Sequence, residues 1–238
     1  MLIDDATPHA SAAHPGVRAL ALSGALAVVV TVVMIGAMDL RQATESVTLL
    51  RRTISQYALG PQRWVFDSAV LLLAAGSAAI LAALVHRGLA RWRSGGAVAL
   101  LLWSLGLVVV VLFPKNDWSR GGDEISGHVH RFGSLLAFVS LPVAALLLAR
   151  PWLRDAVWGV HARWSFGLGA ASVVAFSPLL LAIVRSAVGG TPWWRLVPLG
   201  YVERALVLVE VMAVLAIGVW AVAACARPKV SSWPPGTI

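Results

Sequence analysis

Six long apolar runs constrain this chain more than any other feature of its sequence. They lie near Val17–Met38, Trp64–Val85, Gly96–Phe113, His128–Ala149, Trp164–Val184 and Val202–Ala224. Each has about the 20 residues that a helix needs to cross a bilayer core of roughly 30 Å. The runs are continuous rather than alternating, so they predict membrane helices and not the strands of a barrel.

The composition excludes a water-soluble protein. Of the 238 residues, 59% are hydrophobic and 13% charged, whereas soluble domains have about 45–50% apolar and about 25% charged residues. The sequence predicts an all-α integral membrane protein, a six-transmembrane-helix bundle with ordered extracytoplasmic loops. We expect a polar tail at 1–16, a membrane domain at 17–225 and a disordered tail at 226–238. Helix 1 is interpreted as an uncleaved signal-anchor, because its apolar run is too long for a signal peptide.

The distribution of arginine favours one orientation in the membrane. The net charge of +8 comes from basic residues between the apolar runs, which indicates loops beside phospholipid rather than a nucleic-acid partner. The loops 86–95 and 150–163 are rich in arginine, compact and contain almost no acid. Basic residues of the other face are interleaved with acids. We therefore expect a multi-pass protein of the cell membrane with both termini cytoplasmic.

Four different short motifs lie on the predicted outer face. They are TISQYALG before the second run, FPKND after the third, His130 at the start of the fourth and GYVER at the start of the sixth. In this order they resemble the DUF998 family of multi-pass membrane proteins, from about Arg51 to Trp220. The resemblance implies the fold and a shared outer-face site, but no particular reaction. It also selects Asp117 as the match for the family's aspartate.

Two acids within the apolar runs are candidate catalytic groups. Glu210 lies deep in the last run, where a charge costs at least about 2.5–3.5 kcal/mol. It must face the bundle and be either protonated or paired. Asp67 lies three residues into the second run; in the alternative interpretation it is a carboxylate near the helix N-terminus, where the helix dipole stabilises its charge.

His130 and Arg204 complete the predicted site. We expect Asp67, His130, Arg204 and Glu210 to converge on one polar cavity open to the outer half of the bundle. Arg204 is six residues before Glu210, about 120° around the helix, so we expect it to bind an outer-loop acid instead. In the alternative interpretation His130 and Arg204 hold carbonyl groups of the outer segments.

The sequence indicates no metal site and no cofactor. Cys225 is the single cysteine, and no span contains paired histidines at helical spacing, so a zinc or haem site is not expected. Most of the 11 tryptophans fall at the two predicted membrane boundaries, as in an interfacial aromatic belt. Trp103 lies within the third run and is a candidate for lining a pocket.

These observations favour a membrane-embedded enzyme with acid/base chemistry on a lipid or isoprenoid-type substrate, of the cyclase or isomerase class. Its catalytic groups would be Asp67, His130 and Glu210. The candidate substrate-binding residues are Ser55, Tyr57, Trp103, Asp117 and Arg204. The expected partners are membrane lipids and a hydrophobic small molecule. The alternatives are a non-catalytic lipid-binding or assembly subunit and a small-molecule transporter.

Overall fold

The protein is a bundle of six long helices in the computed structural model, which describes residues 15–44, 52–116 and 125–227. The long helices are α1 Pro15–Thr44, α2 Arg63–His86, α3 Gly95–Leu112, α4 Ile125–Ala149, α5 Gly159–Gly189 and α7 Leu199–Cys225. The short elements are the 3-10 helices η1 Ile54–Leu59 and η2 Arg150–Trp152 and the four-residue helix α6 Trp193–Leu196. All six long helices are long and apolar enough to cross a membrane. The predicted all-α membrane fold is confirmed.

The helices extend beyond the apolar runs from which they were predicted. Helix α1 continues past Met38 to Thr44, and α5 starts at Gly159 and ends at Gly189. A helix satisfies its own backbone hydrogen bonds, so it continues into polar sequence where the membrane ends. The predicted tails at 1–16 and 226–238 lie outside the described residues except for their innermost positions.

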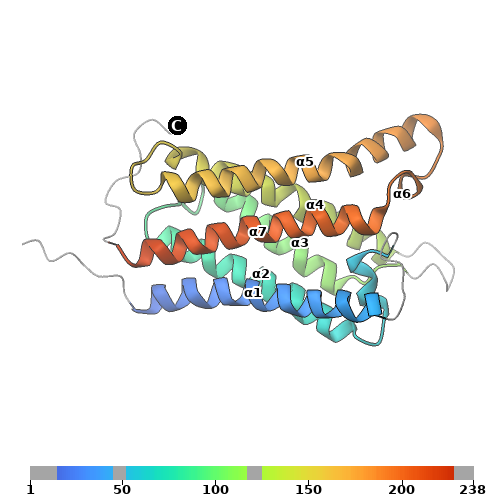
Figure 1. The fold of residues 1–238 in the computed structure, drawn as a ribbon, viewed down its shortest axis with the longest axis horizontal. Helices are drawn as coiled ribbons and strands as arrows, with labels where there is room; N and C mark the ends of the chain where they lie inside the picture. Colours follow the sequence, from blue (N-terminus) through green and yellow to red (C-terminus); the bar gives the residue numbers. More distant parts are fainter. Residues whose placement is uncertain (1–14, 45–51, 117–124, 228–238) are drawn as a thin grey trace, which may run out of the picture.

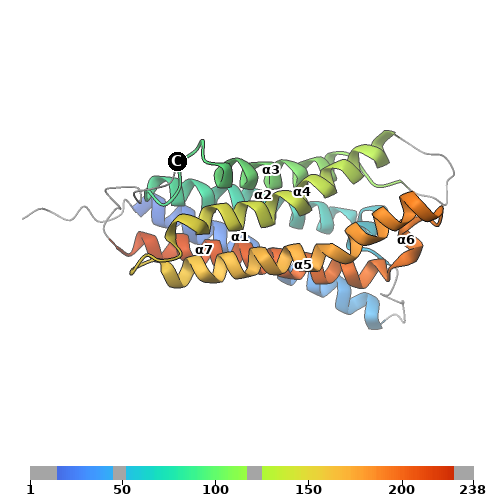
Figure 2. The same cartoon turned by 90° about the horizontal axis from the view of Figure 1, so that it is seen from above.

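The six helices form a closed ring in which neighbours in sequence are mostly neighbours in space. Helix α1 packs along α2, α3 along α4, and α5 along both α4 and α7, while α7 closes the ring against α1. Helix α7 also contacts α2 and α4 across the ring, and the largest fully buried side chains come mainly from α2, α3, α4 and α7. The helices share one long axis (Figure 1), and α5 lies beside α7 in both views (Figure 2).

Glycines allow two of these helix pairs to approach closely. A Cβ atom on Gly76 of α2 would lie 2.8 Å from the carbonyl oxygen of Gly24 on α1, and the reverse distance is also 2.8 Å. Between α3 and α4, a Cβ atom on Gly106 would lie 2.7 Å from the carbonyl oxygen of Gly133. Membrane helices associate through such small residues, because lipid gives no hydrophobic drive for helix contact.

The two ends of the bundle differ. We call the end with Pro15 and Cys225 the proximal end and the end with η1 and α6 the distal end (Figure 1). At the proximal end the Cys225 thiol lies 3.8 Å from the carbonyl oxygen of Val17. The Arg87 guanidinium there donates to the carbonyl oxygens of Ala224, at 3.0 Å, and Arg227. It thereby ties the α2–α3 loop to the end of α7 and to the residue two positions beyond it.

The tryptophans divide into two groups. Four have exposed rings near the helix ends, as expected of an interfacial belt: Trp64, Trp92, Trp164 and Trp194. Trp152 and Trp158 were also expected in the belt, but they are 2% and 4% exposed. The Trp152 ring packs edge-on against Trp220 with centroids 6.4 Å apart. The Trp152 and Trp158 rings are therefore buried at the proximal end of the bundle and do not face lipid headgroups.

Candidate functional site

An ion pair joins the distal ends of α1 and α7. The guanidinium of Arg204 donates from Nη2 to Oδ1 of Asp39 at 2.8 Å and from Nε to Oδ2 at 3.0 Å. The Tyr57 hydroxyl in η1 donates to the same carboxylate at 2.6 Å. Two parallel N–H···O bonds make this a geometrically specific pair.

Arg204 also holds the chain that precedes η1. Its Nη1 donates to the carbonyl oxygen of Arg52 at 2.5 Å and to that of Gly200 at 3.0 Å. One side chain thus connects α1, the start of η1 and the first turn of α7. Arg204 was expected to bind an acid of an outer loop; its partner Asp39 instead lies within α1.

A second polar network holds Thr53 and Ser55, at the start of the TISQY segment. Lys115 follows α3, and its Nζ donates to the Thr53 and Ser55 hydroxyls at 2.8 and 3.2 Å. The backbone N–H of Ser55 donates to Oε1 of Glu203 at 3.3 Å. Because Glu203 and Arg204 are consecutive on α7, the two networks meet along the same segment TISQY.

The electrostatics of these networks change two acid–base equilibria. Burial lowers the pKa of the Lys115 ammonium below its ordinary value, the Glu203 charge opposes this, and the Arg131 charge reinforces it. Burial raises the pKa of the Tyr57 hydroxyl, and so do its hydrogen bond to Asp39 and the charge of that group, while Arg204 has the opposite effect. Tyr57 therefore remains a neutral hydrogen-bond donor.

The residues after α3 pack against the first turns of α4. The Ser126 hydroxyl donates to the carbonyl oxygen of Pro114 at 2.8 Å. Asn116 is buried against Gly127, where an added Cβ atom would lie 2.0 Å from Oδ1 of Asn116. A glycine is therefore required at position 127 for FPKN to reach α4.

His130 also joins α4 to the end of α3. Its Nδ1 lies 2.9 Å from the carbonyl oxygen of Phe113 and 3.1 Å from that of Val110. A carbonyl oxygen only accepts, so Nδ1 carries the proton. In the neutral imidazole Nε2 is then the unprotonated nitrogen, and it is buried with no hydrogen-bond partner among the described residues.

Glu210 is a fully buried acid near the middle of α7. It is 0% exposed, and neither carboxyl oxygen has a hydrogen-bond partner within the described residues. It lies near the middle of α7, about 16 Å from Leu199 at a rise of 1.5 Å per residue. Glu203 is seven residues earlier and so lies on the same face of the helix, about 10 Å nearer the distal end.

Two further predicted site residues have other partners. Asp67 pairs with Arg63, four residues earlier on α2, at 3.0 Å, and both side chains are partly exposed. Trp103 is 2% exposed, and its indole N–H donates to the Ser77 hydroxyl at 3.1 Å. Trp103 is therefore held in the interface between α2 and α3.

The structure brings some of the predicted residues together and leaves others apart. Tyr57 and Arg204 meet at Asp39, and Ser55 lies between Lys115 and Glu203. No hydrogen bond or ion pair among the described residues joins Asp67, His130 or Glu210 to one another. Asp117 lies outside the described residues.

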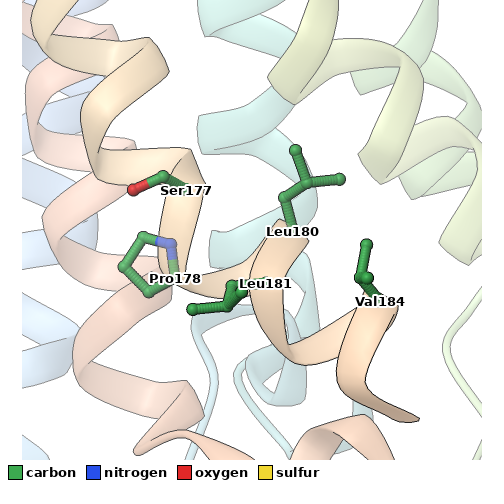
Figure 3. A pocket seen from close by; sticks show the side chains of 5 residues that line it. All are labelled: Ser177, Pro178, Leu180, Leu181 and Val184. Carbon is green, nitrogen blue, oxygen red and sulfur yellow. The ribbon is translucent and has the colours of Figure 1, made fainter. Parts of the chain in front are cut away.

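A groove of about 520 Å³ opens elsewhere, on the distal half of α5. Its described lining comes from that helix alone: Ser177, Pro178, Leu180, Leu181 and Val184 (Figure 3). None of the predicted site residues contributes to it. Leu180, Leu181 and Val184 are 51%, 60% and 53% exposed, so the groove belongs to the outer surface of the bundle.

The arrangement offers an acid in the interior of the bundle and, toward the distal end, two networks that each combine a cation with a carboxyl group: Arg204 with Asp39, and Lys115 with Glu203. Among residues 15–44, 52–116 and 125–227, no three His, Cys, Asp or Glu side chains are placed to hold a metal ion. Glu210, Glu203 and Lys115 can transfer protons and form hydrogen bonds.

Sequence reasoning did not single out Asp39 or Lys115. Asp39 directly follows the first apolar run, and only the continuation of α1 as a helix brings it to Arg204. Lys115 lies within the FPKND motif and is one of only two lysines in the chain. Its position in a motif was an available signal.

Comparison with known proteins places the chain in a family. DUF998, described as "Protein of unknown function (DUF998)", matches residues 25–221. No curated protein matches the chain, and neither does any solved structure. The family match covers all six long helices in whole or in part and both distal networks. The chain belongs to the DUF998 family of multi-pass membrane proteins.

Proposed function

We propose that the protein is a membrane-embedded enzyme that performs acid/base chemistry on a lipid or isoprenoid-type substrate, with Glu210 as the proton donor. The proposal depends on one observation, the complete burial of a carboxyl group that has no partner among the described residues. An unpaired carboxylate is costly in such surroundings, so the neutral acid is the favoured form. A neutral acid in an apolar site is a proton donor.

The apolar surroundings of Glu210 suit a hydrophobic substrate. Its buried neighbours along α7 include Leu206, Val211 and Val214. Protonation of a carbon–carbon double bond, the first step of a proton-initiated cyclisation or isomerisation, needs an acid and little water. Asp67 and His130 have other partners, so we assign them no step.

A lipid comparison tests this proposal. Membranes from cells that express the wild type, Glu210→Gln or Asp67→Asn are extracted, and their lipids are compared by mass spectrometry. Glutamine keeps the shape of glutamate but supplies no acidic proton. Compared with membranes that lack the protein, we expect at least one hydrophobic species to change in amount when the wild type or Asp67→Asn is expressed. Glu210→Gln should leave the amount of that species unchanged. Identical lipid profiles for wild type and Glu210→Gln at equal protein levels would refute the proposal.

A second candidate function is a non-catalytic lipid-binding or assembly subunit. It is favoured by His130 and Arg204, which both donate to backbone carbonyl groups of the distal segments. In this alternative the distal networks shape a binding cap, and Glu210→Gln changes neither the lipid profile nor the co-purifying partners.

We further propose that the protein resides in the cell membrane with its proximal end in the cytoplasm. Eight arginines and one aspartate lie at the proximal end among the described residues: Arg18, Arg87, Arg91, Arg93, Arg150, Arg154, Arg163, Arg227 and Asp155. Such loops remain on the cytoplasmic side. In a Cys225→Ala background, a membrane-impermeant thiol reagent applied to intact cells should label Leu59→Cys and not Arg91→Cys. The reverse labelling would overturn this orientation.

A further inference from the structure

Five exposed arginines lie at the proximal end in three chain segments, which together we call the junction. Arg91 and Arg93 lie in the α2–α3 loop, Arg150 and Arg154 in and after η2, and Arg163 near the start of α5. All five side chains belong to exposed residues. Three separate segments thus contribute cations to one end of the bundle.

Hydrogen bonds hold these segments side by side. The indole N–H of Trp152 donates to the carbonyl oxygen of Leu89 at 3.1 Å, which ties η2 to the α2–α3 loop. Nη1 of Arg163 lies 3.3 Å from the carbonyl oxygen of Leu153, which ties α5 to the same segment. Hydrogen bonds therefore fix the segments that carry the five arginines relative to one another.

The single acid at this junction is already used by the backbone. Oδ1 of Asp155 accepts hydrogen bonds from the N–H groups of Val157 and Trp158 at 2.8 and 2.7 Å. These three segments contain five exposed arginines and one carboxylate; a sixth arginine, Arg87, is buried and bonds to the end of α7. The junction therefore has a strong positive charge that its own acidic residue does not neutralise.

Two exposed tryptophans place the junction at the membrane surface. Trp92 lies between Arg91 and Arg93 and is 50% exposed, and Trp164 follows Arg163 and is 66% exposed. Exposed indole rings at the ends of membrane helices lie at the level of the lipid headgroups. The arginines beside them are then at the level of the lipid phosphates.

We propose that this junction binds the headgroup of an anionic phospholipid. The five arginines supply charge and planar N–H donors for phosphate, while the neighbouring tryptophans contact the upper acyl chain. A free phosphate ion lacks that second contact and binds more weakly. This site is independent of the reaction proposed for Glu210.

Lipid retention during purification tests the site. The wild type is purified from nanodiscs of phosphatidylcholine and phosphatidylglycerol at equal amounts, and the retained lipids are quantified by mass spectrometry. We expect phosphatidylglycerol to be enriched. Each arginine near an anionic surface contributes about a five-fold preference, so Arg93→Gln/Arg154→Gln should lower the enrichment by about 25-fold. The matched control is Arg185→Gln/Arg195→Gln, which removes two exposed arginines from the distal half and should leave the enrichment unchanged.

Three results would overturn the proposal. They are equal retention by Arg93→Gln/Arg154→Gln and wild type, an equal loss in both double variants, and displacement of phosphatidylglycerol by millimolar inorganic phosphate. If the proximal double variant does not fold, the wild type is measured over a salt series. The enrichment should fall as salt screens the arginines, and an enrichment unaffected by salt contradicts the site.

Discussion

Arg204 and Asp39 are 165 positions apart in sequence and form a two-point ion pair that closes the distal end of the bundle. Their side chains are 14% and 25% exposed, so water screens the pair only partly. The same carboxylate accepts the Tyr57 hydroxyl, and the same guanidinium holds the carbonyl oxygen of Arg52. The pair thus connects the first helix, the last long helix and the segment between α1 and α2.

Substitution at this pair should destabilise the protein strongly. Arg204→Ala leaves the Asp39 carboxylate without its cation and the Arg52 carbonyl without its donor. We expect a loss of about 2–3 kcal/mol in the free energy of unfolding, measured in detergent by thermal or chemical unfolding. Arg63→Ala is the matched control, because its pair with Asp67 is an exposed i,i+4 contact that contributes about 0.3–0.5 kcal/mol. Equal losses in the two variants would show that the distal pair has no special role.

The contact between α1 and α2 should depend on a glycine. In Gly76→Ala the new methyl would lie 2.8 Å from the Gly24 carbonyl oxygen and 2.9 Å from the Cβ atom of Ala27. Both are too close, so the helices must separate, at a cost of about 1–3 kcal/mol. Gly36→Ala is the control, because no heavy atom lies within 4 Å of its added Cβ. If Gly76→Ala and Gly36→Ala both unfold at the wild-type temperature, the close packing of α1 against α2 described above is contradicted.

Lys115 should titrate below the ordinary lysine value. Burial lowers its pKa, whereas the Glu203 charge raises it, so removal of that charge by Glu203→Gln should lower the pKa further. The measurement is the pH profile of acetylation of Lys115, followed by mass spectrometry, since only the neutral amine reacts. The half-point in the wild type should lie below 10.5, and in Glu203→Gln it should lie lower still. An upward shift in Glu203→Gln would contradict the network.

The same titration affects stability in a defined direction. Below its depressed folded-state pKa, Lys115 is charged in both the folded and the unfolded chain. Between that pKa and 10.5, the unfolded chain binds more protons than the folded one. The contribution of Lys115 to stability therefore rises with pH across this window.

The sequence was sufficient for the fold because membrane helices depend on local properties. The length and apolar character of the six runs, such as Val202–Ala224, determine where a helix can cross a bilayer. The ends were less predictable, since α1 continues through the polar residues after Met38. That extension carries Asp39, so the sequence did not identify it as the partner of Arg204, because the predicted end of α1 was six residues too early.

The candidate site was predicted only in part, because side-chain pairing depends on relative helix positions. The sequence indicated that Glu210 must face the bundle, and it is 0% exposed. It did not indicate that Asp67 pairs with Arg63 or that the indole of Trp103 bonds to Ser77. Each of these partners lies on the same helix or an adjacent one, and helical spacing alone does not choose among them.

The state of the Glu210 carboxyl group tests the central proposal most directly. Infrared difference spectra of the wild type against Glu210→Gln, in lipid at neutral pH, separate the C=O stretch of a protonated carboxyl from the bands of a carboxylate. We predict a protonated-carboxyl band that is present in the wild type and absent in Glu210→Gln, because a buried carboxyl with no partner among the described residues is neutral. Carboxylate bands assigned to Glu210 at neutral pH, with no protonated band, would contradict its role as the proton donor.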